Sequence, residues 1–195
     1  MVSWGLSSMN NVRLWSTAGH FGTKAMVRKS FLIWASVLII GNIGSTLFAL
    51  GNHGHGILDF AGHANLLSIK TLWLTVTESY AHLNGYTEHG RNFYFYILMI
   101  DFLVPITGAF FFVCSFSFFY LNHRLSASIY ILFWVLSILF ILSDHAENIF
   151  ILLMLNHLPN TIPMYSYLVT VGLTLKFGIS LANCATIAAL FLTQS

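Results

Sequence analysis

Charge is what this sequence has least of. Asp, Glu, Lys and Arg make up 7% of its 195 residues, whereas 57% are hydrophobic. Soluble domains carry about 25% charged residues, so a soluble fold of this length could not cover its apolar surface. The eight Lys and Arg residues are also too few and too scattered to follow a phosphate backbone. The composition therefore excludes a nucleic-acid-binding protein and favours a membrane protein.

Recognisable catalytic and cofactor motifs are also missing. The sequence has no GxSxG motif, no P-loop, no dinucleotide-binding fingerprint and no series of histidine boxes. Nine histidines suggest a haem, but His145 alone lies well inside an apolar run, and a bis-histidine haem needs a facing pair. Cys114 and Cys184 also fall in apolar runs, where they are expected to be small buried hydrophobes rather than a disulfide. We therefore predict no cofactor.

Long apolar runs dominate what is present. About 20 apolar residues suffice to cross the hydrocarbon core of a bilayer. Four such runs are found, at residues 31–50, 92–119, 128–155 and 164–192. They predict an all-α integral membrane protein, a bundle of four transmembrane helices within a domain covering residues 31–195. The 18 phenylalanines are expected to face lipid.

The longest connection, residues 51–92, contains one further segment of helical character. Within residues 66–83, Leu67, Leu74 and Ala81 recur at a spacing of seven residues. Charged residues in the same segment argue against a fifth span. The pattern therefore predicts an amphipathic helix that lies in the membrane interface between the first two spans. A short re-entrant or extramembrane helix is the alternative.

Residues 1–30 contain no Asp or Glu and four cations, Arg13, Lys24, Arg28 and Lys29. They are interpreted as a cytoplasmic tail, with an acid-poor organelle-targeting segment as the alternative. With the N-terminus inside, five Lys and Arg residues fall on the cytoplasmic side and two fall opposite, so both termini are predicted to be cytoplasmic. An endomembrane such as the endoplasmic reticulum is favoured for a eukaryotic protein, and the acid-poor segment keeps a mitochondrial location open.

Charged residues interrupt three of the four apolar runs: Asp101, Asp144, Glu147 and Lys176. Each such charge costs roughly 2.5–3.5 kcal/mol on insertion scales, so these residues need partners or a wet cavity. All four lie about nine to twelve residues, or roughly 14–18 Å, from the same end of their spans. Asp144, Glu147 and Asn148 are spaced i, i+3, i+4 and share one helix face. We predict that these five residues form an intramembrane polar cluster.

Proline and glycine positions support this cluster. Pro105 removes a hydrogen bond to the carbonyl of Asp101 and is predicted to kink the second span. Gly172 and Gly178 are predicted to let a neighbouring helix approach closely beside the cluster, and Gly41 is predicted to do the same in the first span. The cluster is thus expected where helices pack tightly.

Two interpretations of the cluster remain open. It is either a structural network that locks the bundle, or a functional site such as a proton relay, a cation site or a catalytic centre for a lipid. Three acids against one base leave an excess of two negative charges. An acid is therefore protonated, a cation binds, or Arg91 or a histidine reaches the cluster.

Polar residues outside the spans give weaker candidates. Glu78, His82 and Arg91 are predicted to lie near the external face, where they form either a mouth to the buried cluster or the wet side of an interfacial helix. Histidines of the glycine-rich first loop could bind a metal: His53, His55 and His63. Solvated loop histidines are the favoured interpretation, so no metal site is predicted.

Residues 75–185 resemble an uncharacterised family of small four-span membrane proteins from bacteria and lower eukaryotes. The matching pattern comprises Gly90, Arg91, Asp101, Phe102, Pro105, Asp144, Glu147, Asn148 and Lys176. The resemblance implies the four-span architecture and the same polar residues. It implies no activity, since none is known to us for the family.

Three functions are consistent with these observations. The favoured one is non-enzymatic: a structural, assembly or complex-subunit role in which the polar cluster holds the bundle. The alternatives are a small proton- or cation-linked transporter that uses the cluster, and a lipid-modifying membrane enzyme. The expected partners are the lipid bilayer and either other membrane proteins or a lipid ligand.

Overall fold

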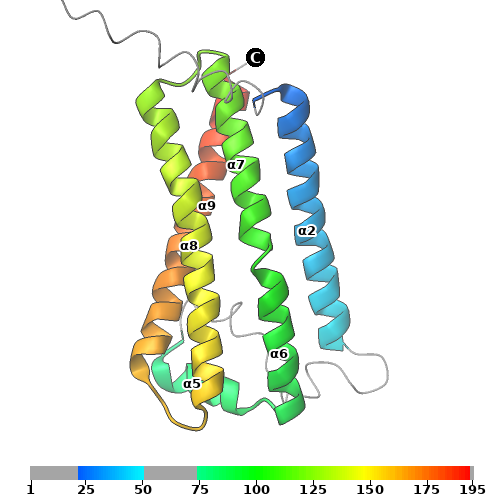
Figure 1. The fold of residues 1–195 in the computed structure, drawn as a ribbon, viewed down its shortest axis with the longest axis vertical. Helices are drawn as coiled ribbons and strands as arrows, with labels where there is room; N and C mark the ends of the chain where they lie inside the picture. The colour runs from blue at the N-terminus through cyan, green and yellow to red at the C-terminus, as the bar shows by residue number, and fades with distance from the viewer. Residues whose placement is uncertain (1–21, 51–73, 194–195) are drawn as a thin grey trace, which may run out of the picture.

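The computed structural model describes residues 22–50 and 74–193, and every regular element in these ranges is a helix. In chain order the helices are α2 (Lys24–Leu50), α5 (Val76–Asn84), α6 (Glu88–Asp101), α7 (Val104–Leu121), α8 (Ala127–His157) and α9 (Pro163–Leu192). Figure 1 shows the long helices running side by side along one axis, with short α5 lying across one end. The all-α class is therefore confirmed for the described ranges.

Within residues 22–50 and 74–193, three helical segments are long and apolar enough to cross a membrane. They are Gly90–Leu121, Ala127–His157 and Pro163–Leu192, with 32, 31 and 30 residues. The first of them joins α6 and α7 end to end. Outward-facing side chains such as Leu132 and Leu139 are exposed, as on a surface that faces lipid rather than water. These segments coincide with the last three predicted spans.

Helix α2 contains the predicted first span, residues 31–50, and packs against α7. Trp34 stacks on Phe111 with ring centroids 5.1 Å apart. Gly108 leaves room for this contact, because a Cβ there would lie 2.7 Å from Trp34 Nε1. Gly41 has no neighbouring atom within 4 Å among the described residues, so the close approach predicted there is wrong. Side chains of α2 after residue 43 lie outside the described part.

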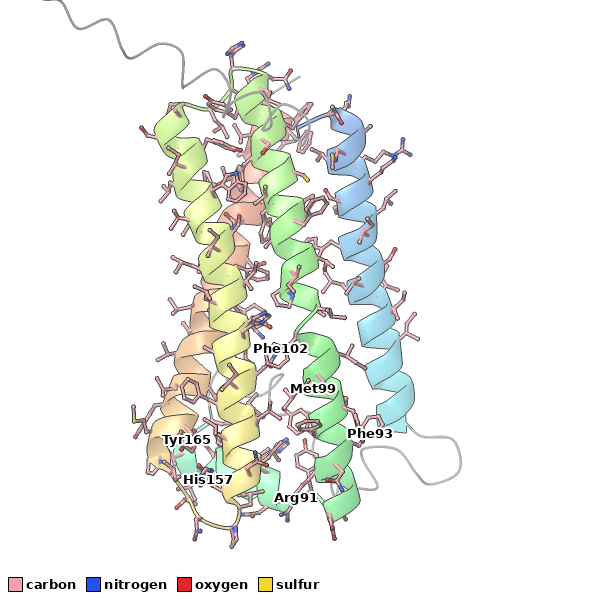
Figure 2. All side chains as sticks on the ribbon, viewed as in Figure 1. Arg91, Phe93, Met99, Phe102, His157 and Tyr165 are labelled. Atoms are coloured by element: carbon pink, nitrogen blue, oxygen red, sulfur yellow. The ribbon has the colours of Figure 1, made fainter. Side chains whose placement is uncertain are left out.

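An interruption at Phe102 and Leu103 separates α6 from α7. Pro105 lies in the first turn of α7, where its fixed φ fits a helix and its missing amide hydrogen is tolerated. The interruption predicted from Pro105 is therefore present. As a consequence Asp101 is the last residue of α6, and Figure 2 shows Phe102 at the break, facing α8.

Buried apolar residues form two clusters, one toward each end of the bundle. The tyrosine cluster consists of Tyr80, Leu83, Tyr86, Tyr94, Leu98, Ile151, Met154 and Val169. The phenylalanine cluster consists of Ala109, Phe111, Phe112, Phe116, Phe119, Tyr130, Phe133, Phe140 and Ile187. Between the residues that α8 gives to the two clusters lie Asp144, Glu147 and Asn148. A polar layer therefore separates two apolar ones.

The phenylalanine cluster corrects one expectation from the sequence. Phe112, Phe116 and Phe119 are 0% exposed and face neighbouring helices instead of lipid. Phe116 stacks on Phe133 with centroids 4.0 Å apart, which fills the space between α7 and α8. Aromatic rings bury large areas and pack by offset stacking, so they serve as core residues here. Other phenylalanines, such as Phe177, do face outward.

Helix α5 covers the end of the bundle at the tyrosine cluster. The hydroxyl of Tyr80 donates to the carbonyl of Ile162 at 3.0 Å and accepts from the amide of the same residue at 2.9 Å. The predicted helix at 66–83 differs from the observed one, which begins at residue 76 because Thr75 and Glu78 form a capping box. The part of the prediction up to residue 73 lies outside the described residues.

Candidate functional site

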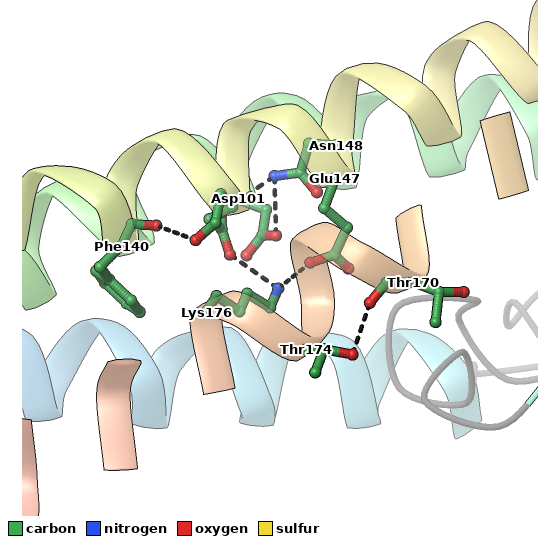
Figure 3. A network of polar contacts seen from close by, with 9 residues as sticks. Asp101, Phe140, Glu147, Asn148, Thr170, Thr174 and Lys176 are labelled. Carbon is green, nitrogen blue, oxygen red and sulfur yellow. Dashed lines mark hydrogen bonds and ion pairs between the residues drawn. The ribbon is translucent and has the colours of Figure 1, made fainter. Parts of the chain in front are cut away.

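The five residues of the predicted polar cluster come together in the middle of the bundle. Lys176 of α9 reaches α8, where its Nζ lies 2.8 Å from Asp144 Oδ1 and 2.6 Å from Glu147 Oε2 (Figure 3). Glu147 is 0% exposed, and the Lys176 side chain is 14% exposed. One cation therefore pairs with two carboxylates of the neighbouring helix.

The close approach of α8 and α9 makes these contacts possible. A Cβ at Gly172 would lie 2.8 Å from the carbonyl oxygen of Ser143 and 3.2 Å from Glu147 Cβ. The bare glycine therefore lets the two backbones pack closely, one turn before Lys176, as its position predicts. Gly178 has nothing within 4 Å in the described structure, so the same prediction is wrong there.

Asn148 extends the network to a third helix. Its Nδ2 donates to Asp101 Oδ2 at 3.2 Å and to Asp144 Oδ2 at 3.4 Å. The interruption at Pro105 places Asp101 at the end of α6, beside α8. Figure 3 shows the amide of Asn148 between the two carboxylates. A chain of polar contacts thus runs from α6 through α8 to α9.

Two buried acceptor atoms of the cluster lack a hydrogen-bond donor in the described structure. Glu147 Oε1 and Asn148 Oδ1 have no hydrogen-bond donor among the described residues. Glu147 Oε2 lacks a hydrogen bond of standard geometry but keeps its 2.6 Å ion-pair contact with Lys176. A buried acceptor without a donor loses about 1–3 kcal/mol relative to water. These two oxygens therefore keep the capacity to accept a further hydrogen bond.

Two cavities lie among the described residues, and both are away from the polar cluster. One of about 510 Å³ lies among α2, α7 and α9, and one of about 200 Å³ lies near Arg91 and Asn156. Neither is lined by a residue of the polar cluster. The ion pairs are therefore packed between helices rather than arranged around either of these cavities.

The predicted external mouth does not form one site with the cluster. Arg91 Nε donates to the carbonyl of Tyr86 at 3.2 Å, and the Tyr86 hydroxyl lies 3.3 Å from His82 Nε2. Figure 2 shows Arg91 at the end of the bundle, and ten residues of helix, about 15 Å, separate it from Asp101. Arg91 therefore does not supply the missing positive charge.

Glu78 caps the N-terminus of its own helix, α5, and does not form part of a mouth to the polar cluster. Its carboxylate accepts from the amide and the hydroxyl of Thr75, each at 2.7 Å. These bonds, the backbone one first, lower the pKa of Glu78. The fully exposed carboxylate thus stabilises the first turn of α5.

The histidines do not gather into a metal site in the described ranges. His53, His55 and His63 lie outside those ranges, and within them no group of three or more His, Cys, Asp or Glu could hold a metal. The ring centroids of His145 and Phe102 lie 4.8 Å apart, and the buried Nδ1 of His145 has no hydrogen-bond partner in the described structure. It therefore lies beside the interruption of α6 and α7 without bonding to the carboxylates.

Asn183 is a buried polar residue that the sequence analysis did not single out. It is 0% exposed, and neither atom of its amide has a partner within the described part of the chain. It lies seven residues after Lys176, and seven residues bring a helix back to the same face. That spacing is the signal that could have identified it from the sequence.

Comparisons with protein-family models, with curated proteins and with solved structures found no match to this chain. The resemblance of residues 75–185 to an uncharacterised four-span family therefore stays a prediction. In the described part of the chain the polar cluster has two short ion pairs, one bridging amide and two buried acceptors without donors.

Proposed function

We propose that the chain is a four-span integral membrane protein with a structural role, as an assembly factor or as a subunit of a membrane complex. The single observation that carries the proposal is the pairing of Lys176 with both Asp144 and Glu147 at ion-pair distance. A cation that pairs with two acids of a neighbouring helix links the two helices. In lipid, polar contacts between helices are among the forces that hold a bundle together.

Charge distribution supports the topology of this proposal. Lys24, Arg28 and Lys29 begin α2, and Arg124 lies in the turn between α7 and α8 at the same end of the bundle (Figure 1). Cations collect on the cytoplasmic side of membrane proteins, so we assign this end and both termini to the cytoplasm. Helix α2 is then the first span, and α5 lies at the opposite interface. An endomembrane or, alternatively, a mitochondrial membrane is the proposed location.

A small proton- or cation-linked transporter is the second candidate. The observation that favours it is that Glu147 Oε1 and Asn148 Oδ1 find no hydrogen-bond donor among the described residues, within a cluster of three acids and one base. A proton bound to Glu147 would use one of these free acceptor positions. Intramembrane carboxylates of this kind occur in proton relays.

The lipid-modifying enzyme is the weakest of the three candidates. It requires Glu78 or His82 beside a cavity that accepts an acyl chain. Neither residue lines either of the two cavities described above. Glu78 is occupied by Thr75, and His82 bonds to Tyr86.

The Lys176→Met variant separates the first two candidates. It removes the one cation that the described residues bring to the cluster and leaves Asp144 and Glu147 unpaired, a loss of about 3–5 kcal/mol for a buried pair. We expect little folded protein in the membrane fraction. A triple variant that also carries Asp144→Asn and Glu147→Gln removes the two carboxylates left without their cation and is expected to recover folded protein. Lys29→Met, which removes an exposed cation of α2, is the control.

One result would overturn the structural proposal. If Lys176→Met accumulates as folded protein at the level of the Lys29→Met control, the ion pairs do not hold the bundle. Proteoliposomes loaded with a pH-sensitive dye then test the second candidate. Folded Lys176→Met that has lost a proton flux present in the unsubstituted protein would favour transport.

A further inference from the structure

The larger cavity, of about 510 Å³, lies where α2, α7 and α9 meet. Its walls are mainly apolar and aromatic: Phe31 and Trp34 from α2, Phe111 and Phe118 from α7, and Ile187 and Phe191 from α9. Phe31 is 48% exposed and Phe191 is 38% exposed, so the cavity is a groove at the outer surface of the bundle. Its volume falls in the range of about 300–1,000 Å³ that is typical of ligand pockets.

Two cations lie at one end of this groove. Lys24 and Arg28 line it, and their spacing of four residues puts them on the same face of α2. Among the described residues no Asp or Glu lines the groove, and neither cation has an ion-pair partner there. Positive charge is therefore available at the mouth, whereas the interior is apolar.

The length of the groove matches one leaflet of a bilayer. Lys24 lies at the first residue of α2 and Trp34 ten residues further along, which corresponds to about 15 Å of helix. Phe111, which also lines the groove, lies eight residues inside the predicted second span, about 12 Å of helix. The hydrocarbon core is about 30 Å thick, so the groove extends from the membrane surface toward the midplane. A phospholipid has the same distribution of charged and apolar groups: its charged headgroup lies at the membrane surface, and its acyl chains end near the midplane.

We propose that this groove binds an anionic phospholipid, whose phosphate lies between Lys24 and Arg28 and whose acyl chain lies along the aromatic walls. Zwitterionic lipids would gain the apolar contacts without the net charge attraction. The proposal goes beyond the structural role of the polar cluster. It rests on α2 as a membrane span, and its readout, lipid retention, is independent of Lys176.

Native mass spectrometry of the full chain in detergent tests the headgroup contact. The probes are dioleoyl phosphatidylglycerol and dioleoyl phosphatidylcholine, added separately. We expect tighter binding of phosphatidylglycerol, and a loss of about fivefold in its affinity for each cation removed in Lys24→Gln/Arg28→Gln. The matched control is Lys29→Gln/Arg124→Gln, which removes two cations that do not line the groove and is expected to bind as the unsubstituted protein does.

A second pair of variants tests the acyl-chain contact. Ala188 lines the groove and Ala185, one turn earlier on α9, does not. We expect Ala188→Phe to fill the groove and abolish retention of phosphatidylglycerol, whereas Ala185→Phe retains it. Thermal unfolding of both variants identifies any loss of fold. Because both alanines are exposed, both variants are expected to unfold at the temperature of the parent.

Three outcomes would overturn the proposal. Equal loss of affinity in the two double variants would mean that phosphatidylglycerol responds to overall charge instead of to the groove. Retention by folded Ala188→Phe would place the lipid elsewhere. Crosslinking from a photoactivatable residue at position 188 to residues 1–21 of the chain, in place of added lipid, would identify the chain itself as the occupant.

Discussion

At the end of the bundle covered by α5, buried tyrosines carry hydroxyl groups that bond to neighbouring elements, whereas the buried aromatics at the other end are mostly phenylalanines. Tyr80 bonds to both backbone groups of Ile162, and Tyr86 bonds to His82. In the phenylalanine cluster, contacts such as that of Phe116 with Phe133 are stacking contacts. Hydrogen bonds of the tyrosines help to fix the first end. At the second end most contacts join phenylalanine rings, and Tyr130 adds hydrogen bonds with Ser117 and Trp134.

The polar cluster lies between these two ends and has features of both. Its ion pairs form only when Lys176 lies within about 3 Å of the two carboxylates, as in a hydrogen bond. At Gly172, α8 and α9 also pack as closely as helices in an apolar core. Where such an approach is absent, as between α2 and α9, a groove remains. A small residue such as Gly172 permits two helices to approach closely, and polar groups such as Lys176 then fix their register.

The largest effect is expected at the phenylalanine cluster. Phe116→Ala deletes a fully buried ring and leaves a cavity, so we expect a loss of about 3–5 kcal/mol in the free energy of unfolding. Reversible denaturation in mixed micelles measures it. Phe177→Ala, at a ring that is 53% exposed, is the control and should change the stability little. Equal effects of the two variants would contradict a core packed by shape.

A smaller loss is expected at the contact that supports the polar cluster. In Gly172→Ala the new methyl group meets a backbone carbonyl, which cannot rotate away, so α8 and α9 must separate. Overpacking of this kind costs about 1–3 kcal/mol, measured by the same denaturation. Gly178→Ala adds the same methyl group where nothing lies within 4 Å of it in the described structure, and it should be neutral. A neutral Gly172→Ala would show that the helices can be moved apart freely.

The smallest effect is expected at the tyrosine cluster. Tyr80→Phe keeps the ring and removes the hydroxyl that bonds to Ile162, so the turn before α9 loses two hydrogen bonds. We expect about 1–2 kcal/mol in stability and faster hydrogen exchange at the amide of Ile162. Tyr167→Phe, at an exposed ring of α9, should change neither quantity. Unchanged exchange at Ile162 in Tyr80→Phe would mean that packing, not hydrogen bonding, holds this end.

Much of the fold could be predicted from local patterns. Apolar runs identify the three long segments, Pro105 identifies the interruption of α6 and α7, and the i, i+3, i+4 spacing puts Asp144 and its neighbours on one face. These features are properties of single helices. Predictions about which helices meet were less successful: Gly172 lies at a helix contact, whereas Gly178 and Gly41 contact no other helix among the described residues. A small residue permits an approach without specifying the partner.

The sequence by itself determined that the protein belongs in a membrane and that the four charged residues inside its apolar runs lie at one level, because composition and depth along a helix are local quantities. Tertiary structure alone decided that Lys176 pairs with both Asp144 and Glu147, that Asn148 bridges to Asp101, and that α2 and α9 leave a groove. Those outcomes depend on the rotation and separation of neighbouring helices. The packing of many side chains sets both quantities, and no single run of residues encodes them.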